Sequence, residues 1–248
     1  MTARVTRIWR HPVKSHGREV LESVALTAGE TLPGDRRWAV AHEASVADGD
    51  AWAPCANFTR AAKAGRLNAV SAILDEASGR IAFRHPDLPP LEIDPETEGQ
   101  RLIDWARPLM PADRAQSARV VRAAGRGMTD TAFPSVSLLN AASIAAVSER
   151  AGFDLGAERW RANFLIDGLR PWQEWDWIGR DLRIGGAVLH VESRISRCNA
   201  TKANPGTGRL DADTLSLLKA GWGHQDFGIY ATITTGGSVA AGDRLEVL

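Results

Sequence analysis

Two cysteines carry the sulfur chemistry open to this 248-residue chain. Cys198 lies between Arg197 and Asn199 in the segment VESRISRCNATKANPGTG, and Cys55 lies in WAPCANF. An accessible cysteine is a nucleophile and a soft metal ligand, whereas a free cysteine inside a protein packs as a small apolar side chain. Both interpretations of Cys198 are open from this segment alone. We interpret Cys55 as structural.

Other catalytic signatures are missing from the sequence. It contains no GxSxG elbow, no GxxxxGK[ST] phosphate loop and no HExxH pair, and the segments GRGMTD and GTGRLD lack the third glycine of a dinucleotide fingerprint. Two distant cysteines exclude a cysteine-based zinc site and a disulfide framework. These absences weigh against a hydrolase and against a nucleotide-binding protein.

The charge balance and the N-terminus bear on partners and location. Thirty basic and thirty acidic side chains cancel, so no net field attracts nucleic acid or an anionic membrane, and a highly charged substrate is slightly disfavoured. MTARVTRIWRHPVK has no signal-peptide core, and no run approaches the ~18 apolar residues of a membrane span. We therefore expect a cytoplasmic protein that binds neither nucleic acid nor a membrane.

Most of the candidate residues lie in or next to short predicted strands. RVTRIWRHPV, SVALTAG and DRRWAVAH open the chain as strands, RLNAVSAILD and RIAFRH form a hairpin, and DLPPLEIDPET is a loop or edge segment. FLIDG, DLRIGGAVLHVESR, GIYATITTGG and RLEVL are further strands separated by glycine turns. This spacing predicts a mainly β (α+β) protein, with an antiparallel β-barrel packed on a smaller N-terminal β-rich domain.

A few helices and one boundary complete the expected organisation. ETEGQRLIDWARPLM predicts a helix that Pro111 ends, LLNAASIAAVSERAG predicts a core helix that Gly152 ends, and DADTLSLLKAG predicts a shorter helix that Gly221 ends. The polar, basic stretch after Pro111 is a boundary or a crossing strand. We place an N-terminal domain at residues 1–115 and a barrel domain at residues 116–248.

Four segments in this order carry a family resemblance: HPVKS (11–15), GDRRW (34–38), RWRANFLIDG (159–168) and SRC (196–198). Together with FGIY and VAAGDRLEVL near the end, they resemble the MOSC superfamily. The similar members carry an N-terminal β-barrel extension and include the mitochondrial amidoxime-reducing component and its bacterial relatives. The resemblance covers the chain from about Ile8 to Val247.

The resemblance implies a cofactor and the residues that bind it. In that family the barrel binds molybdenum cofactor, and Cys198 matches the cysteine that supplies a thiolate ligand to the metal. A soft thiolate suits a metal held by a sulfur-rich dithiolene. The pterin and its terminal phosphate would be held by Lys14, Ser15, Arg36, Arg161, Asn163, Ser196, Arg197 and Tyr230. We further expect Arg161 and Asn163 to share one face of a strand and bracket one ligand.

Structural alternatives stand beside these assignments. Lys14 could be an ordinary strand-end lysine, Arg36 a surface arginine, and Tyr230 part of the barrel wall. Four tryptophans near the RWRAN segment could form an aromatic wall over a substrate pocket or simply pack in the core; they are Trp160, Trp172, Trp175 and Trp177.

The chain departs from the family pattern at a few positions. Asn204 and Ala162 replace a usual aspartate and proline, and Phe133 with Pro134 stand where some relatives use hydroxyl residues. There is no cysteine-rich iron–sulfur domain and no pyridoxal-phosphate domain like that of molybdenum cofactor sulfurases. Electrons would therefore come from a separate flavin, haem or iron–sulfur protein.

The implied activity is reduction of small N-hydroxylated compounds, such as amidoximes, hydroxylamines and N-hydroxylated bases, by a molybdoenzyme. A non-catalytic carrier of cofactor or of a persulfide on Cys198 is a second hypothesis. A metal-free barrel that binds a small anion is a third.

Overall fold

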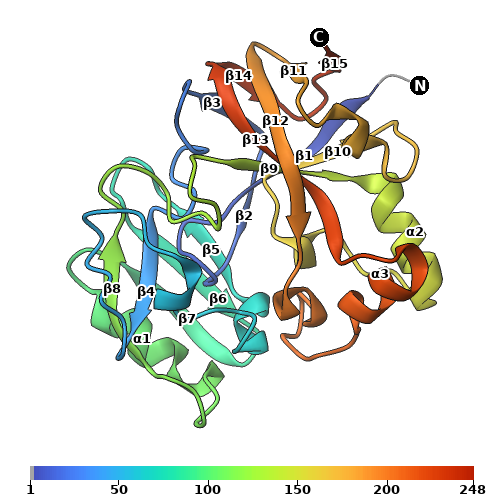
Figure 1. Ribbon diagram of the computed structural model, residues 1–248. Coiled ribbons are helices and arrows are strands. Elements are labelled where there is room, and N and C mark those ends of the chain that lie inside the picture. Colours follow the sequence, from blue (N-terminus) through green and yellow to red (C-terminus); the bar gives the residue numbers. More distant parts are fainter. Residues whose placement is uncertain (1–2) are drawn as a thin grey trace.

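The computed structural model describes residues 3–248 and contains two β-rich regions (Figure 1). The larger region is built on an eight-stranded sheet. Its strands are β1 (Arg4–Arg10), β2 (Glu19–Leu21), β9 (Val136–Asn140), β10 (Phe164–Asp167), β11 (Asp181–Ile184), β12 (Ala187–Ser196), β13 (Asp226–Thr235) and β15 (Leu245–Val247). They follow the order β15-β11-β12-β13-β9-β10-β1-β2. All neighbours are antiparallel except β9 and β10, which are parallel.

The large sheet curls until β15, at one end of the sheet, meets the start of β1, next to the other end. The main-chain N–H of Val5, in β1, donates to Asp243 O (2.9 Å), and the N–H of Leu245, in β15, donates to Ala3 O (2.8 Å). A further strand pair, β3 (Ser23–Leu26) with β14 (Gly237–Ala240), lies beside it. The curled sheet encloses a core of alternating valine, leucine and isoleucine side chains, which confirms the expected barrel-like, mainly antiparallel fold.

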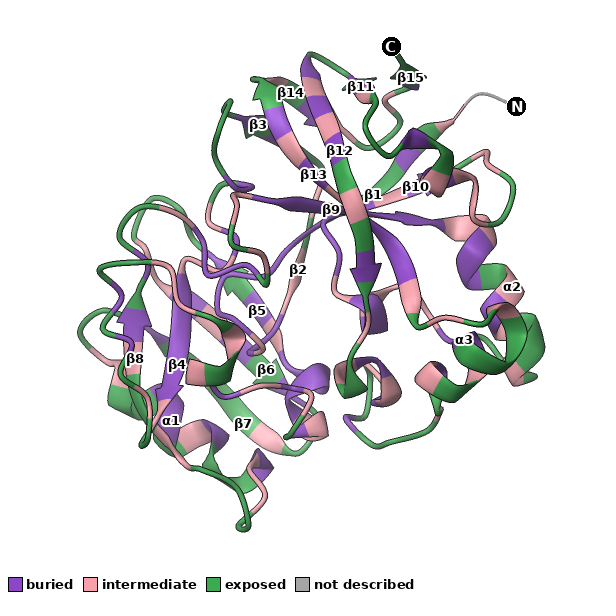
Figure 2. Ribbon diagram, viewed as in Figure 1, coloured by how far each residue is buried: buried purple, intermediate pink, exposed green. Residues whose placement is uncertain are grey.

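The smaller region contains two short sheets and one helix. Its elements are β4 (Trp38–His42), β5 (Ser71–Leu74), β6 (Ile81–His85), β7 (Leu88–Ile93), α1 (Gly99–Ala106) and β8 (Ser117–Arg122). β4 pairs with β8, and β5, β6 and β7 form a meander in which β7 is an edge. The apolar side of α1 packs on these sheets, and both regions have buried interiors (Figure 2). The predicted hairpin and edge segment are thus present, although residues before Val70 form a 3-10 helix, Gly65–Ala69, instead of a strand.

Local capping interactions mark both ends of the two longer helices of the large region. α2 (Ala141–Ala151) begins where the Asn140 side chain accepts from Ala142 N (2.9 Å) and ends at Gly152, whose φ is +80°. α3 (Thr214–Trp222) begins at Asp213, whose side chain accepts from Ser216 N. It ends at Gly223, not at Gly221, because Gly223 adopts the left-handed conformation. Likewise α1 ends at Ala106 and continues into a 3-10 helix, Arg107–Leu109, before Pro111.

The strands cross the sequence boundary that we expected near residue 115. β1, β2 and β3 belong with strands from the C-terminal half, whereas β8 follows residue 115 and pairs with β4. The two regions are therefore joined by several chain crossings, and the boundary at 115/116 stays a prediction. Among residues 3–248, no helix has the length and apolar character needed to span a membrane.

Candidate cofactor-binding site

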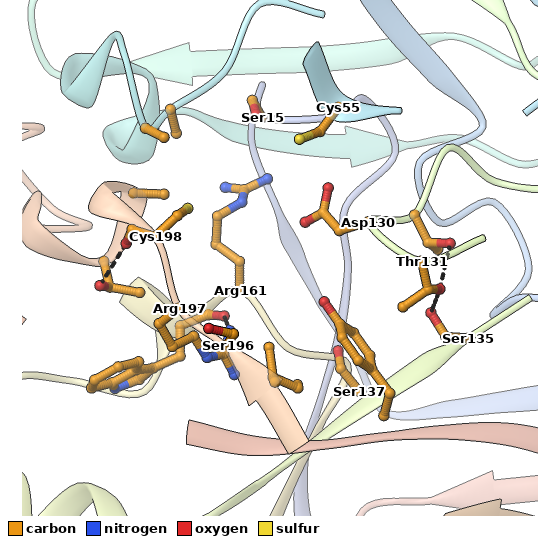
Figure 3. Close-up of a pocket in the computed structure, with 18 of the residues that line it drawn as sticks. Ser15, Cys55, Asp130, Thr131, Ser135, Ser137, Arg161, Ser196, Arg197 and Cys198 are labelled. Atoms are coloured by element: carbon orange, nitrogen blue, oxygen red, sulfur yellow. Dashed lines mark hydrogen bonds between the residues drawn. The ribbon is translucent and has the colours of Figure 1, made fainter. Parts of the chain in front are cut away.

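One pocket of about 470 Å³ brings together every residue that the sequence analysis assigned to the site. Its walls come from the first turns of the chain, the loop before β9, the segment between α2 and β10, the end of β12, and β13 (Figure 3). The predicted residues on these walls are Lys14, Ser15, Arg36, Arg161, Asn163, Ser196, Arg197, Cys198 and Tyr230. Positions more than 200 residues apart thus face one cavity.

Cys198 lies where β12 ends. The strand stops at Ser196, and Cys198 is the N-cap of a short 3-10 helix, Asn199–Lys202, with an extended backbone. Its side chain is exposed and free, so it does not fill space in a core. Thr201 supports this turn, because its hydroxyl donates to Cys198 O (3.1 Å). The Cys198 thiol is therefore accessible in the pocket as a sulfur ligand.

Arg197 is held beside the thiol by main-chain carbonyls. Its Nε donates to Phe227 O and its Nη1 donates to Trp160 O, both at 2.8 Å. Its Nη2 is buried and has no hydrogen-bond partner among the residues described. Burial lowers the pKa of Arg197 to about 10. A buried guanidinium that meets carbonyls but no carboxylate favours an anion at its free nitrogen.

Arg161 is a second pocket arginine with a buried nitrogen that lacks a partner among the residues described. Its Nη2 donates to Gly17 O (3.2 Å), and its buried Nη1 has no partner within residues 3–248. Burial, followed by the charges of Arg36 and Arg18, lowers the pKa of Arg161 to about 9. Two arginines with free nitrogens therefore face one cavity. This arrangement can bind a multiply charged anion such as a phosphate ester.

The expected strand-face pairing of Arg161 with Asn163 is wrong. β10 begins only at Phe164, and Arg161 ends a 3-10 helix, Glu158–Trp160, with φ at +52°. The Asn163 side chain is almost fully buried: its Oδ1 accepts from Ser137 N and Oγ (both 3.0 Å), and its Nδ2 donates to Trp9 O (3.3 Å). Asn163 therefore ties β1, β9 and β10 together and holds the pocket floor in place.

Lys14 is a buried pocket residue and not a strand-end surface lysine. Its Nζ donates to Met128 O (2.6 Å) and forms an ion pair with Asp130, whose side chain is 55% exposed. Although burial acts in the other direction, the charges of Lys14 and Arg36 hold the pKa of Asp130 below its usual value. Asp130 is the pocket's acidic side chain, and the sequence analysis missed it because GRGMTD has no periodicity or motif that marks it.

Arg36 is anchored by buried polar groups behind the pocket. It forms an ion pair with Asp35, and its Nη2 donates to Arg161 O (2.9 Å). Asp35 also accepts from His11 N (2.7 Å). Burial opposes ionisation of Asp35, but the Arg36 charge and the His11 hydrogen bonds outweigh it and keep the pKa of that carboxyl low. Arg36 is thereby fixed in one orientation.

Backbone strain is concentrated at this pocket. Within residues 3–248, four residues other than glycine have a positive φ, and three of them line the cavity: Ser15 (64°), Arg36 (51°) and Arg161 (52°). Each such residue costs on the order of 1 kcal/mol or more. Strained backbone that collects around one cavity is typical of a functional site.

Tyr230 lines the remaining wall, and Phe133 packs against its ring. Their rings meet edge to face, with centroids 6.5 Å apart. Burial, together with the charge of Asp130, raises the pKa of Tyr230 to about 12. The hydroxyl groups that Phe133 and Pro134 lack come from their neighbours, because Thr131 Oγ1 and Ser135 Oγ are 2.7 Å apart and both line the pocket.

Only one of the four clustered tryptophans lines the pocket. Trp160 stacks on Phe227 with ring centroids 3.9 Å apart and contributes to the wall. Trp172 and Trp175 pack on each other, and Trp177 is buried in the barrel core. Core packing therefore accounts for three of the four. Cys55, which we interpreted as structural, lines the pocket as well.

Comparisons with known proteins identify two family domains in the chain. The family model described as the MOSC N-terminal beta barrel domain matches residues 2–115, and the model of the MOSC domain matches residues 131–246. Sequence relatives include the molybdenum cofactor sulfurases of Drosophila grimshawi (31% identical) and Drosophila mojavensis (32%). The alignments cover 45% and 38% of this chain but only 15% and 12% of those proteins.

Solved structures give a weak similarity of fold. The YuaD protein from Bacillus subtilis is 13% identical, with a TM-score of 0.48 and coverage of 100% of this chain and 96% of that chain. YiiM from Geobacillus stearothermophilus is 17% identical, with a TM-score of 0.37 and coverage of 46% and 53%. Because the two family models together match nearly the whole sequence, this chain belongs to the MOSC superfamily and carries its N-terminal β-barrel domain.

Proposed function

We propose that this protein is a molybdenum cofactor-dependent enzyme of the cytoplasm that reduces small N-hydroxylated compounds with electrons from a separate protein. One observation carries the proposal. An exposed thiol, Cys198, shares a 470 Å³ pocket with two guanidinium groups, those of Arg161 and Arg197, that each have a buried nitrogen without a partner among the residues described.

The donor set fits that cofactor. Cys198 offers the soft sulfur ligand that a molybdenum dithiolene accepts. The free nitrogens of Arg161 and Arg197 suit its terminal phosphate, since guanidinium groups bind phosphate oxygens in pairs. Lys14 and Arg36 add fixed positive charge whose orientation is set by Asp130 and Asp35. One sulfur donor and several nitrogen donors on the same cavity match a ligand that carries both a metal and a phosphate.

The bound cofactor would supply the two-electron reduction. For an amidoxime the balance is R–C(NH2)=N–OH plus two electrons and two protons, giving R–C(NH2)=NH and water. The chain's own groups bind and orient the cofactor and the substrate. With a pKa of about 12, Tyr230 keeps its proton at neutral pH and can donate a hydrogen bond into the pocket. Asp130, whose pKa is lowered, remains a carboxylate that fixes Lys14.

The electrons would come from a flavin, haem or iron–sulfur protein that docks transiently. Neither the charge balance nor the fold assigns that partner, so a chemical reductant is the appropriate donor for a first test. Reduced methyl viologen supplies one electron at a time and needs no docking surface.

Removing the thiol tests the proposal directly. Protein purified from a cofactor-producing host should contain molybdenum and reduce benzamidoxime with reduced methyl viologen. In Cys198→Ala we expect metal content to fall at least about tenfold, because loss of a ligand outweighs the 10–100-fold effect typical of outer-sphere changes, and turnover to be lost. Cys55→Ala is the matched control, since it removes the other thiol. Wild-type protein without molybdenum, or Cys198→Ala that turns over normally, would contradict the proposal.

A carrier of cofactor or of a persulfide is the second candidate. The relatives named molybdenum cofactor sulfurase favour it. A persulfide on Cys198, found by mass spectrometry in protein that reduces neither amidoximes nor hydroxylamines, would support the carrier and exclude the reductase.

A further inference from the structure

The pocket is far more basic than the protein as a whole. The chain has no net charge, yet seven basic side chains and a single acidic one, Asp130, line this cavity. Three of the seven are engaged in ion pairs: Lys14, Arg36 and Arg159. The other four have no carboxylate within ion-pair distance in residues 3–248; they are Arg60, Arg161, Arg194 and Arg197.

Arg60 differs from the residues assigned to the cofactor. It comes from the smaller region, where it follows the 3-10 helix Cys55–Asn57, and neither the motif segments nor the proposed function uses it. Its Nη1 donates to Cys55 Sγ at 3.5 Å. Sulfur is a weak acceptor, so this contact leaves most of the donor capacity of the guanidinium free. Figure 3 shows Cys55 and Cys198 on either side of Arg161, which places the Cys55 wall across the cavity from the thiol.

The segment that carries Arg60 is rigidly held. Thr59 N donates to Val40 O (2.8 Å), and the Thr59 hydroxyl is hydrogen-bonded to that of Ser117 (2.9 Å). Phe58 is buried in an apolar cluster next to β4 and β8. The backbone at Arg60 is therefore fixed, and ordering its side chain on a ligand costs little beyond side-chain entropy.

Arg194 lies on another wall of the pocket. It lies on β12, and its guanidinium is 4.0 Å from the ring centroid of Trp175, as in a cation–π contact. Stacking on Trp175 restrains the Arg194 guanidinium at its place on β12, whereas Arg60 lies on the wall that carries Cys55. Because both residues add a positive charge to the same pocket, comparing them separates a local contact of Arg60 from the effect of the pocket's overall charge.

We infer that Arg60 recognises a carboxylate on the substrate, so that the preferred substrates are N-hydroxylated compounds that also bear an anionic group. The inference rests on the proposed function and narrows its substrate class. A guanidinium binds a carboxylate through two parallel N–H···O bonds. Arg60 and Arg194 are the pocket cations that neither the cofactor assignment nor an ion pair within residues 3–248 uses, and their charge further favours an anionic over a neutral substrate.

Paired substrates test the inference on cofactor-loaded protein. Benzamidoxime and 4-carboxybenzamidoxime differ only in the carboxylate. The measured quantity is kcat/KM for the carboxylated substrate divided by kcat/KM for the neutral one. In Arg60→Gln we expect this ratio to fall about tenfold or more, the usual effect of losing a hydrogen bond to a charged group. Lys63→Gln removes the same charge from an exposed position of the same segment that does not line the pocket. Arg194→Gln removes it from the pocket itself.

The outcomes are distinct. A ratio that falls only in Arg60→Gln supports direct recognition, and a ratio that is unchanged in Arg60→Gln, or that falls equally in Arg194→Gln, overturns it. Calorimetric titration of 4-carboxybenzamidine, the expected product, gives a readout without turnover. Binding by the wild type that Arg60→Gln loses would support the carboxylate site even if neither amidoxime is reduced, in which case only the reductase proposal fails. Equal binding by both proteins would refute the site.

Discussion

At the scale of single residues, burial sets the protonation state of two histidines next to the pocket. His11 and His16 lie behind Lys14 and Arg36 and are fully buried. Burial, followed by the charges of Arg36 and Arg161, lowers the pKa of His11 to about 3, despite the hydrogen bond to Asp35. Burial lowers the pKa of His16 to about 4, although the His16 Nδ1 contact with Lys14 O opposes the shift. Both histidines are therefore neutral in the folded protein near pH 5.

These two histidines predict loss of stability in mild acid. Between pH 6.5 and about 4 the unfolded chain binds protons at His11 and His16 that the folded chain does not, so the free energy of unfolding falls as pH falls. Each group contributes up to about 1.4 kcal/mol per pH unit. Urea unfolding at pH 7, 6, 5 and 4 should show this slope, and His11→Asn should reduce it by about one proton. The control is His190→Asn, at a partly exposed position. An unchanged slope in His11→Asn would contradict the assignment.

The sequence predicts residue types at the site better than it predicts their conformation. The motif segments place all the assigned residues on one cavity, although nothing tests their cofactor contacts. Arg161 was expected in a strand, because a positive φ at a residue other than glycine leaves no mark in the sequence. Asp130, Cys55 and Arg60 were missed because they reach the pocket only through the packing of the smaller region and its neighbouring loop on the barrel.

At the scale of elements, the pleated alternation of apolar residues predicted most strands, and local chemistry decided where they end. β8 lies in the stretch after Pro111 that we interpreted as a boundary or a crossing strand, and its charged residues flank only two valines. Pairing with β4 makes it a strand, and that partner lies almost 80 residues earlier in the chain. Such pairing depends on tertiary contacts that propensity does not record.

Gly228, in β13, is a position where the fold requires glycine. Its φ is +77°, and an added Cβ would lie 2.6 Å from Leu138 O in β9. Gly228→Ala should cost about 3 kcal/mol, of which roughly 1 kcal/mol is the left-handed conformation and the remainder the clash. The matched control is Gly79→Ala, because Gly79 has a similar φ, +73°, and nothing within 4 Å of an added Cβ. Its expected cost is only about 1 kcal/mol. Equal losses in urea unfolding would show that β13 relaxes away from β9.

At the scale of the whole molecule, the two family domains are continuous in sequence but interleaved in space. β1 pairs with β10, and β3 pairs with β14, so N-terminal strands complete the large barrel. Between the smaller region and the C-terminal half, the Asn68 side chain donates to Ala200 O (2.7 Å), beside the Cys198 turn. The pocket therefore requires both halves of the chain at once, which explains why composition and net charge, averaged over the molecule, did not reveal its basic lining.

This interleaving predicts that residues 116–248 do not fold alone. Without β1, the main-chain groups of β10 that pair with it lose their partners, and the bonds that join Ala3 and Val5 to the start of β15 are absent. Unpaired edge strands favour aggregation over a closed sheet. The fragment should show no cooperative thermal transition and no near-ultraviolet circular dichroism, and co-expression with residues 1–115 should restore both in a stable complex. A fragment that unfolds cooperatively by itself would mean that the barrel closes without its N-terminal strands.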